Sequence, residues 1–71
     1  MWTKIGSGDY SMQEGSYKLR VERVQDGLWW WALYKDDSVV VSSTDLDHYE
    51  DSRKEAFAAV LAVYRYVLTL S

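Results

Sequence analysis

The chain has 71 residues, no cysteine and a formal net charge of −3. This length predicts one small domain, and the composition excludes disulfides and thiolate metal sites. The longest apolar run, residues 56–64, is far shorter than the roughly 20 residues that a membrane span needs. Because the N-terminal residues show no secretory signal pattern, we expect a cytoplasmic protein that does not enter the membrane.

Residues 1–15 hold three of the four glycines. We interpret them as a flexible or partly docked leader in front of a single domain at residues 16–71. The leader also carries large apolar side chains, which indicate where it would dock: Trp2, Ile5, Tyr10 and Met12.

Three strands are expected next. Tyr17, Leu19 and Val21 alternate with charged residues, the pattern of a half-buried strand. Residues 28–34 and 39–42 are apolar enough to form the second and third strands, and the connections between them are short.

The pairing of the first two strands follows from the length of their loop. A three-residue loop over residues 25–27 pairs Val21 with Trp31, two strong hydrophobes. It likewise pairs Leu19 with Leu33. A two-residue loop would instead oppose tryptophans to charged residues, so we predict the three-residue loop.

The second connection is predicted to be a two-residue turn at Asp36-Asp37. This turn pairs Tyr34 with Val39 and Leu33 with Val40. The core-facing side chains are then Leu19, Val21, Trp29, Trp31, Leu33 and Val40. The outward-facing side chains are Lys18, Arg20, Glu22, Trp30, Ala32, Tyr34, Val39 and Val41.

The run Trp29-Trp30-Trp31 is the most informative feature of this sheet. Successive side chains of a strand point to opposite faces, so Trp30 alone lies on the outer face. A large apolar group on a surface indicates a binding site. The alternative is that Trp30 is only shielded by the neighbouring Arg20 and Glu22, with a cation–π contact to the arginine.

A C-terminal helix completes the predicted fold. Ser52 and Glu55 form a capping box, and good helix formers continue to about Leu68. We therefore predict an α+β fold in which a three-stranded antiparallel sheet packs on one C-terminal helix (β-β-β-α). The helix has a second apolar stripe, which either the leader or a second copy in a homodimer must cover: Phe57, Leu61, Tyr64 and Leu68.

The segment over residues 26–63 has a regular order of Asp-Gly, W-x-W-x-L, a polar turn, Val-Val-Val-Ser-Ser, Tyr49 and a helix. This order resembles the small ββ(β)α repeat of the DUF1508 family, which implies that fold and a tendency to self-associate, without a catalytic motif. Asp36-Asp37 stands where that family usually has Asn-Gly, and Trp30 is additional. The order of elements is also similar to antitoxins of the HicB type, but their proline-containing strand end is missing.

Six acidic residues and no Lys or Arg lie between residues 36 and 51: Asp36, Asp37, Asp45, Asp47, Glu50 and Asp51. Such a block is either a solvated loop or a surface that attracts a basic partner. Its residues around His48 lack the spacing of a calcium loop, so no metal is expected. With one histidine and no cysteine, we expect neither an enzyme nor a cofactor.

We therefore predict a non-enzymatic module that binds a protein with a basic surface. A concrete version is a phage or mobile-element inhibitor of a host defence protein, of the anti-CRISPR kind. The predicted contact residues combine the outer sheet face with the acidic block: Trp30, Tyr34, Val39, Val41, Asp36, Asp37, Asp45, Asp47 and Glu50. Two alternatives remain open. One is a purely structural homodimer, and the other is single-stranded nucleic-acid binding through Lys18, Arg20, Arg23 and Trp30.

Overall fold

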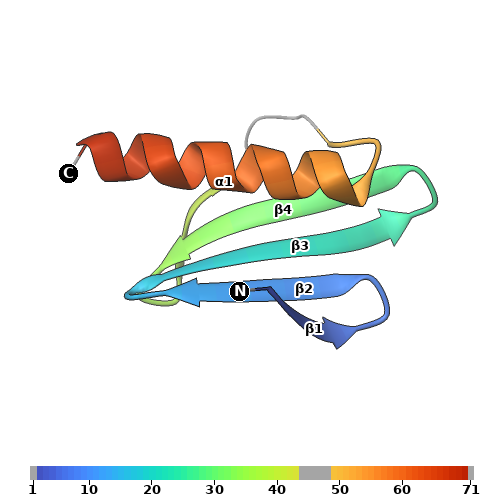
Figure 1. Ribbon diagram of the computed structural model, residues 1–71, viewed down its shortest axis with the longest axis horizontal. Coiled ribbons are helices and arrows are strands. Elements are labelled where there is room, and N and C mark those ends of the chain that lie inside the picture. Colours follow the sequence, from blue (N-terminus) through green and yellow to red (C-terminus); the bar gives the residue numbers. More distant parts are fainter. Residues whose placement is uncertain (1, 44–48, 71) are drawn as a thin grey trace.

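The computed structural model describes residues 2–43 and 49–70. These residues form an antiparallel sheet whose five strands follow one another in chain order, with one helix packed against it (Figure 1). The elements are β1 (Thr3–Gly6), β2 (Asp9–Glu14), β3 (Tyr17–Gln25), β4 (Leu28–Lys35), β5 (Ser38–Ser42) and α1 (Arg53–Leu70). The predicted α+β class and the C-terminal helix are confirmed, but the prediction of three strands is wrong.

The two additional strands come from the segment that we interpreted as a leader. β1 and β2 pair with each other, and β2 pairs with β3. The glycines that suggested flexibility lie at turns instead: Gly8 and Gly15 have φ angles of 81° and 61°. Glycine adopts positive φ without a steric penalty, so these residues permit tight turns between short strands.

The register between β3 and β4 is the predicted one. Val21 lies opposite Trp31, and Leu19 lies opposite Leu33. The loop length is wrong, however, because Gln25 pairs with Leu28 and leaves only Asp26 and Gly27 in the turn. An irregularity between Arg23 and Gln25 inserts one extra residue, and this bulge restores the register that a three-residue loop would have given.

The register between β4 and β5 is only partly as predicted. The turn at Asp36-Asp37 is confirmed, with φ angles of 50° and 68°, and Tyr34 lies opposite Val39. Leu33 lies opposite Val41 instead of Val40, because the register shifts at this point of the ladder. One extra residue in a strand reverses the faces of the residues after it. Val40 is therefore 44% exposed and not in the core, whereas Val41 packs against the core and not on the outer face.

The core lies between α1 and the sheet face formed mainly by β3 and β4. Trp31 is 2% exposed, and the side chains around it are fully buried: Leu19, Val21, Leu33, Ala56 and Val60. The Ser52 hydroxyl accepts a hydrogen bond from the Glu55 amide at 3.2 Å, so the predicted N-cap is present. No helix in the described part of the chain is both long and apolar enough to cross a membrane.

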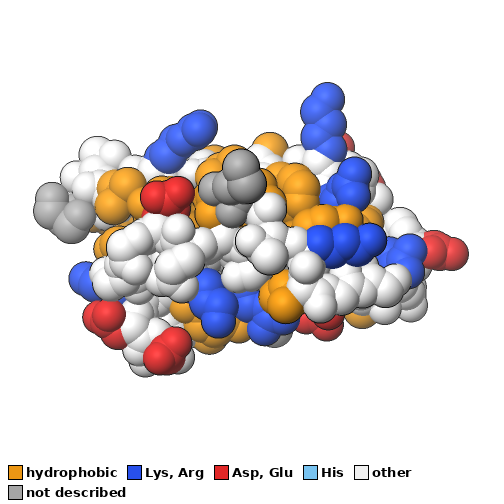
Figure 2. All heavy atoms as spheres, turned by 60° about the horizontal axis from the view of Figure 1, so that its bottom comes forward, with side chains coloured by type: hydrophobic (Ala, Val, Ile, Leu, Met, Phe, Trp, Pro, Cys, Tyr) orange, Lys and Arg blue, Asp and Glu red, His pale blue; other side chains and the backbone are white. Residues whose placement is uncertain are grey.

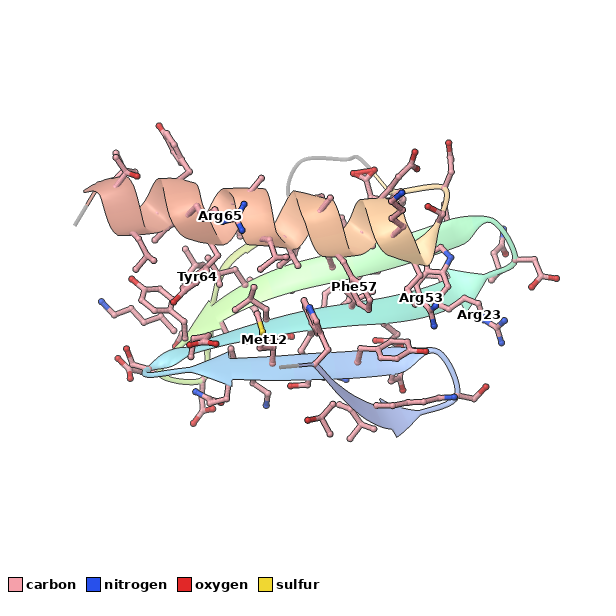
Figure 3. The ribbon with its side chains drawn as sticks, in the orientation of Figure 1. Met12, Arg23, Arg53, Phe57, Tyr64 and Arg65 are labelled. Carbon is pink, nitrogen blue, oxygen red and sulfur yellow. The ribbon has the colours of Figure 1, made fainter. Side chains whose placement is uncertain are left out.

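The second stripe of α1 is covered largely by the chain itself. The Phe57 ring stacks on Trp2 with a centroid distance of 4.5 Å and meets the edge of Tyr10 at 5.4 Å. Tyr64 makes an edge contact with Tyr17 at 5.4 Å. Figure 3 shows Phe57 and Tyr64 projecting from α1 toward the strands. The N-terminal segment thus covers Phe57, which removes that residue from the argument for a dimer through α1.

Leu61 and Leu68 complete this stripe. Leu61 is half-buried and packs against the core, whereas Leu68 is exposed near the end of the helix. Homodimer formation stays a prediction, and the apolar surface that α1 offers to it is smaller than the sequence indicated.

Candidate protein-binding surface

The helix covers one face of the sheet, and no helix in the described part of the chain lies over the opposite face, which we call the open face (Figure 1). Figure 2 shows the molecule with β1 and β2 brought forward, where Lys and Arg side chains are interspersed with hydrophobic ones. The register places the side chains of the open face in three rows across the strands. These rows are Asp9–Glu22–Trp30, Ser11–Arg20–Ala32–Ser42 and Gln13–Lys18–Tyr34–Val39.

Trp30 and Tyr34 lie on the open face, two positions on either side of Ala32 along β4. Both aromatic side chains are half-buried, while Ala32 between them is fully buried. Because no helix covers Ala32, its burial comes from larger neighbours on the same face. The aromatic residues are therefore partly shielded and still offer part of their surface to a partner.

Arg20 lies opposite Ala32, in the centre of the open face. Its Nε atom is buried and has no hydrogen-bond partner within the described residues. Arg20 and Lys18 are balanced on this face by Asp9 and Glu22. The open face thus has an aromatic and apolar side along β4 and β5 and a mixed, nearly neutral side along β2 and β3.

Among the described residues, the acidic side chains predicted to contact a partner do not form one cluster. Asp36 and Asp37 are exposed at the turn that follows β4, beside the Tyr34–Val39 pair. The Asp36 amide donates to the Ser16 carbonyl at 3.0 Å, which holds this turn against the neighbouring one. Asp45, Asp47 and His48 lie outside the described residues.

Glu50 lies at the other end of β4. It exchanges two backbone hydrogen bonds with Trp29, at 2.8 and 3.0 Å, on the same edge of β4 that β5 occupies. Ser43 donates to the Trp31 carbonyl on this edge at 2.9 Å. Of the acidic residues that the structure describes, Asp36 and Asp37 therefore adjoin Tyr34 and Val39, whereas Glu50 lies at the opposite end of β4.

The residues proposed for nucleic-acid binding lie on both faces of the sheet. Lys18, Arg20 and Trp30 share the open face. Arg23 lies opposite Trp29 on the other face, and its guanidinium lies 3.9 Å from the Asp26 carboxylate. A continuous basic stripe, which phosphate binding requires, is thus not formed by these residues.

One cation–aromatic contact was not evident in the sequence. The Arg53 guanidinium donates to the Tyr10 hydroxyl at 2.7 Å and lies over the Tyr10 ring at 5.3 Å. Only the presence of β2 brings these residues together, so a prediction without that strand could not find them. This pair holds the start of α1 against β2, so we assign it a role in the fold and not in binding.

No family model matches this chain, and neither the curated proteins nor the solved structures contain a significant match. The resemblance to the DUF1508 pattern stays a prediction.

Proposed function

We propose that this protein is a non-enzymatic module that binds a protein partner through the β4–β5 side of the open face. The contact residues are Trp30, Tyr34 and Val39, with Asp36 and Asp37 at the rim. The observation that carries the proposal is the position of two half-buried aromatic side chains and an exposed valine on the face without a helix.

Aromatic residues are enriched where proteins bind one another, since a rigid ring buries a large area at a small cost in side-chain entropy. Trp30 and Tyr34 already have reduced freedom because each is half-buried. Their remaining exposed surface would therefore be buried by a partner with little further ordering.

The charges at the rim favour a basic partner. Asp36 and Asp37 are exposed beside Tyr34 and Val39, where they would attract cations without having to be desolvated. Rim charges of this kind raise the association rate more than the final affinity. The narrower proposal, an inhibitor of a host defence protein from a phage or mobile element, rests on the small size and acidity of the chain.

Single-stranded nucleic acid is the second candidate, because Trp30 lies on the same face as Lys18 and Arg20. Base stacking on an aromatic ring beside cations is a common mode of binding. Two observations count against nucleic-acid binding. Arg23 lies on the opposite face of the sheet, and the acidic Asp9 and Glu22 share the open face with Lys18 and Arg20.

The experiment begins with capture of a partner from a bacterial lysate, followed by affinity measurements with the purified partner. Trp30→Ala and Tyr34→Ala should each weaken binding, whereas Tyr66→Ala should not. Tyr66 is the matched control because it is 64% exposed on α1, away from the open face. Equal affinities for all three variants would contradict the proposal. Salt-sensitive binding to an oligothymidine that requires Lys18 and Trp30 would favour nucleic acid instead.

A further inference from the structure

The outer edge of β5 is one of the two free strand edges in the sheet formed by the described residues. No strand lies beyond β5 in the sheet formed by the described residues. Val39 and Val40 are 53% and 44% exposed, and the segment from Ser38 to Ser43 contains no charged side chain. The opposite edge, β1, contains Lys4, and a lysine on an edge strand discourages further strand pairing. Both edge ladders have a register irregularity, but β5 contains no charged residue.

The backbone of Val39 is available for pairing. Lys35 and Ser38 flank the two-residue turn, so they form the hydrogen-bonded pair of the hairpin. The next pair, Tyr34 and Val39, is then a non-hydrogen-bonded pair. Consequently, the N–H and C=O groups of Val39 point away from β4, toward the free edge.

We propose that β5 binds an extended segment of a different, basic protein by strand addition. This inference rests on the proposed function and specifies the partner. The Val39 side chain lies beside Tyr34 on the open face, so an added strand would extend the aromatic and apolar side of that face. The partner segment has apolar residues at alternate positions and Lys or Arg at its C-terminal end.

The position of the cations follows from the charges of the turn. Asp36 and Asp37 lie at the N-terminal end of β5. An antiparallel partner, the slightly more stable arrangement, brings its C-terminal end to this turn. A second copy of β5 does not fit, because the sequence contains no Lys or Arg from residue 36 to residue 52. Pairing of two β5 edges therefore brings no cation to the turn, and the proposal commits to a segment of a different protein.

The probes are two synthetic peptides of identical composition, with alternating valine and threonine and a pair of lysines at either the C-terminal or the N-terminal end. We expect the C-terminal lysines to give about threefold tighter binding at low salt, as surface ion pairs do. Backbone amide shifts should map binding to β5. Equal affinity of both peptides, or shifts confined to β1, would overturn the proposal.

Two substitutions at one position separate the backbone from the side chain. Val39→Pro removes an N–H that the β4–β5 ladder does not use, so the hairpin should remain while peptide binding falls about tenfold. Val39→Thr keeps the N–H and the branched side chain and should therefore lose much less peptide binding than Val39→Pro. Circular dichroism checks the fold of both variants. Unchanged binding by a folded Val39→Pro protein would contradict strand addition.

The charge contribution is tested by changing Asp36→Asn and Asp37→Asn together. Asparagine tolerates the positive φ angles of this turn, so the fold should be kept. The preference between the two peptides should disappear, and its persistence would show that the turn does not set the orientation.

This inference and the proposed function can fail separately. If Val39→Pro still binds the purified partner but Trp30→Ala and Tyr34→Ala do not, the open face is the contact and strand addition is wrong. If only Val39→Pro loses the partner, β5 is the contact and the aromatic residues are not.

Discussion

Trp30 and Trp31 are neighbours in the chain but occupy opposite sides of the same sheet. Trp31 lies under α1 and is almost inaccessible to solvent, whereas Trp30 lies on the face without a helix and keeps part of its surface exposed. The difference arises from strand alternation alone, because both residues belong to β4. The covered face therefore accounts for stability, and the open face carries large side chains that the core does not require.

The largest effect is expected at Trp31. Trp31→Ala removes a large side chain from the core and should lower the free energy of unfolding by about 3–5 kcal/mol. Trp30→Ala should lower it by only about 1 kcal/mol. Urea denaturation gives both values. If the two variants lost a similar amount in denaturation midpoint, the two faces would contribute equally to stability.

A second test concerns the N-terminal contribution to the covered face. Phe57→Ala should destabilise the protein by about 2–3 kcal/mol, less than a fully buried phenylalanine because Phe57 is half-buried. Part of this loss should be shared with Trp2, on which the ring stacks. A double-mutant cycle with Trp2→Ala should give a coupling energy of about 0.5–1.5 kcal/mol. Additive effects would mean that the N-terminal segment does not hold Phe57 in solution.

The oligomeric state tests whether the second stripe of α1 is covered by the chain itself or by a second copy. The sequence predicts a homodimer, for which sedimentation equilibrium at micromolar concentration should give twice the chain mass. If the dimer uses α1, Leu68→Ala should weaken it more than Phe57→Ala, because Leu68 is exposed and Phe57 is already covered. A monomer over this whole range would contradict the dimer and leave the second stripe to the chain itself.

The smallest effect on stability is expected at the acidic turn. Replacing Asp36 and Asp37 by asparagine should change the free energy of unfolding by less than about 0.5 kcal/mol, since both side chains are exposed. Association with a basic partner should become slower, and added salt should reduce the difference. Stopped-flow measurements at low and high salt provide the rates. Identical association rates would make the turn an ordinary solvated loop.

The sequence was sufficient to predict the elements that have a clear periodic pattern of apolar residues. Alternating residues in β3, the tryptophans of β4 and the Ser52 cap led to the correct register of Val21 with Trp31 and to the helix. The N-terminal strands were missed because Gly8 and Gly15 suggest flexibility as readily as they suggest turns. Their turn role becomes visible only once Tyr10 and Met12 are placed beside β3.

The sequence also predicted the sheet face of the candidate contact residues correctly only where no bulge intervenes. Trp30, Tyr34 and Val39 were placed on the correct face because no irregularity separates them from the turn or from the β3 pairing. Val41 was not, because a bulge adds one residue and reverses the alternation beyond it. A bulge depends on how β5 fits against its neighbour, and three consecutive valines carry no signal of where the extra residue lies.

The most direct test of the open face is the affinity of the purified partner for Trp30→Ala, measured together with the stability of that variant. We predict that binding weakens at least about tenfold, as at an interface hot spot, while the free energy of unfolding falls by about 1 kcal/mol or less. Unchanged affinity in a folded Trp30→Ala protein would contradict the account and leave Trp30 as a tryptophan merely shielded by its neighbours.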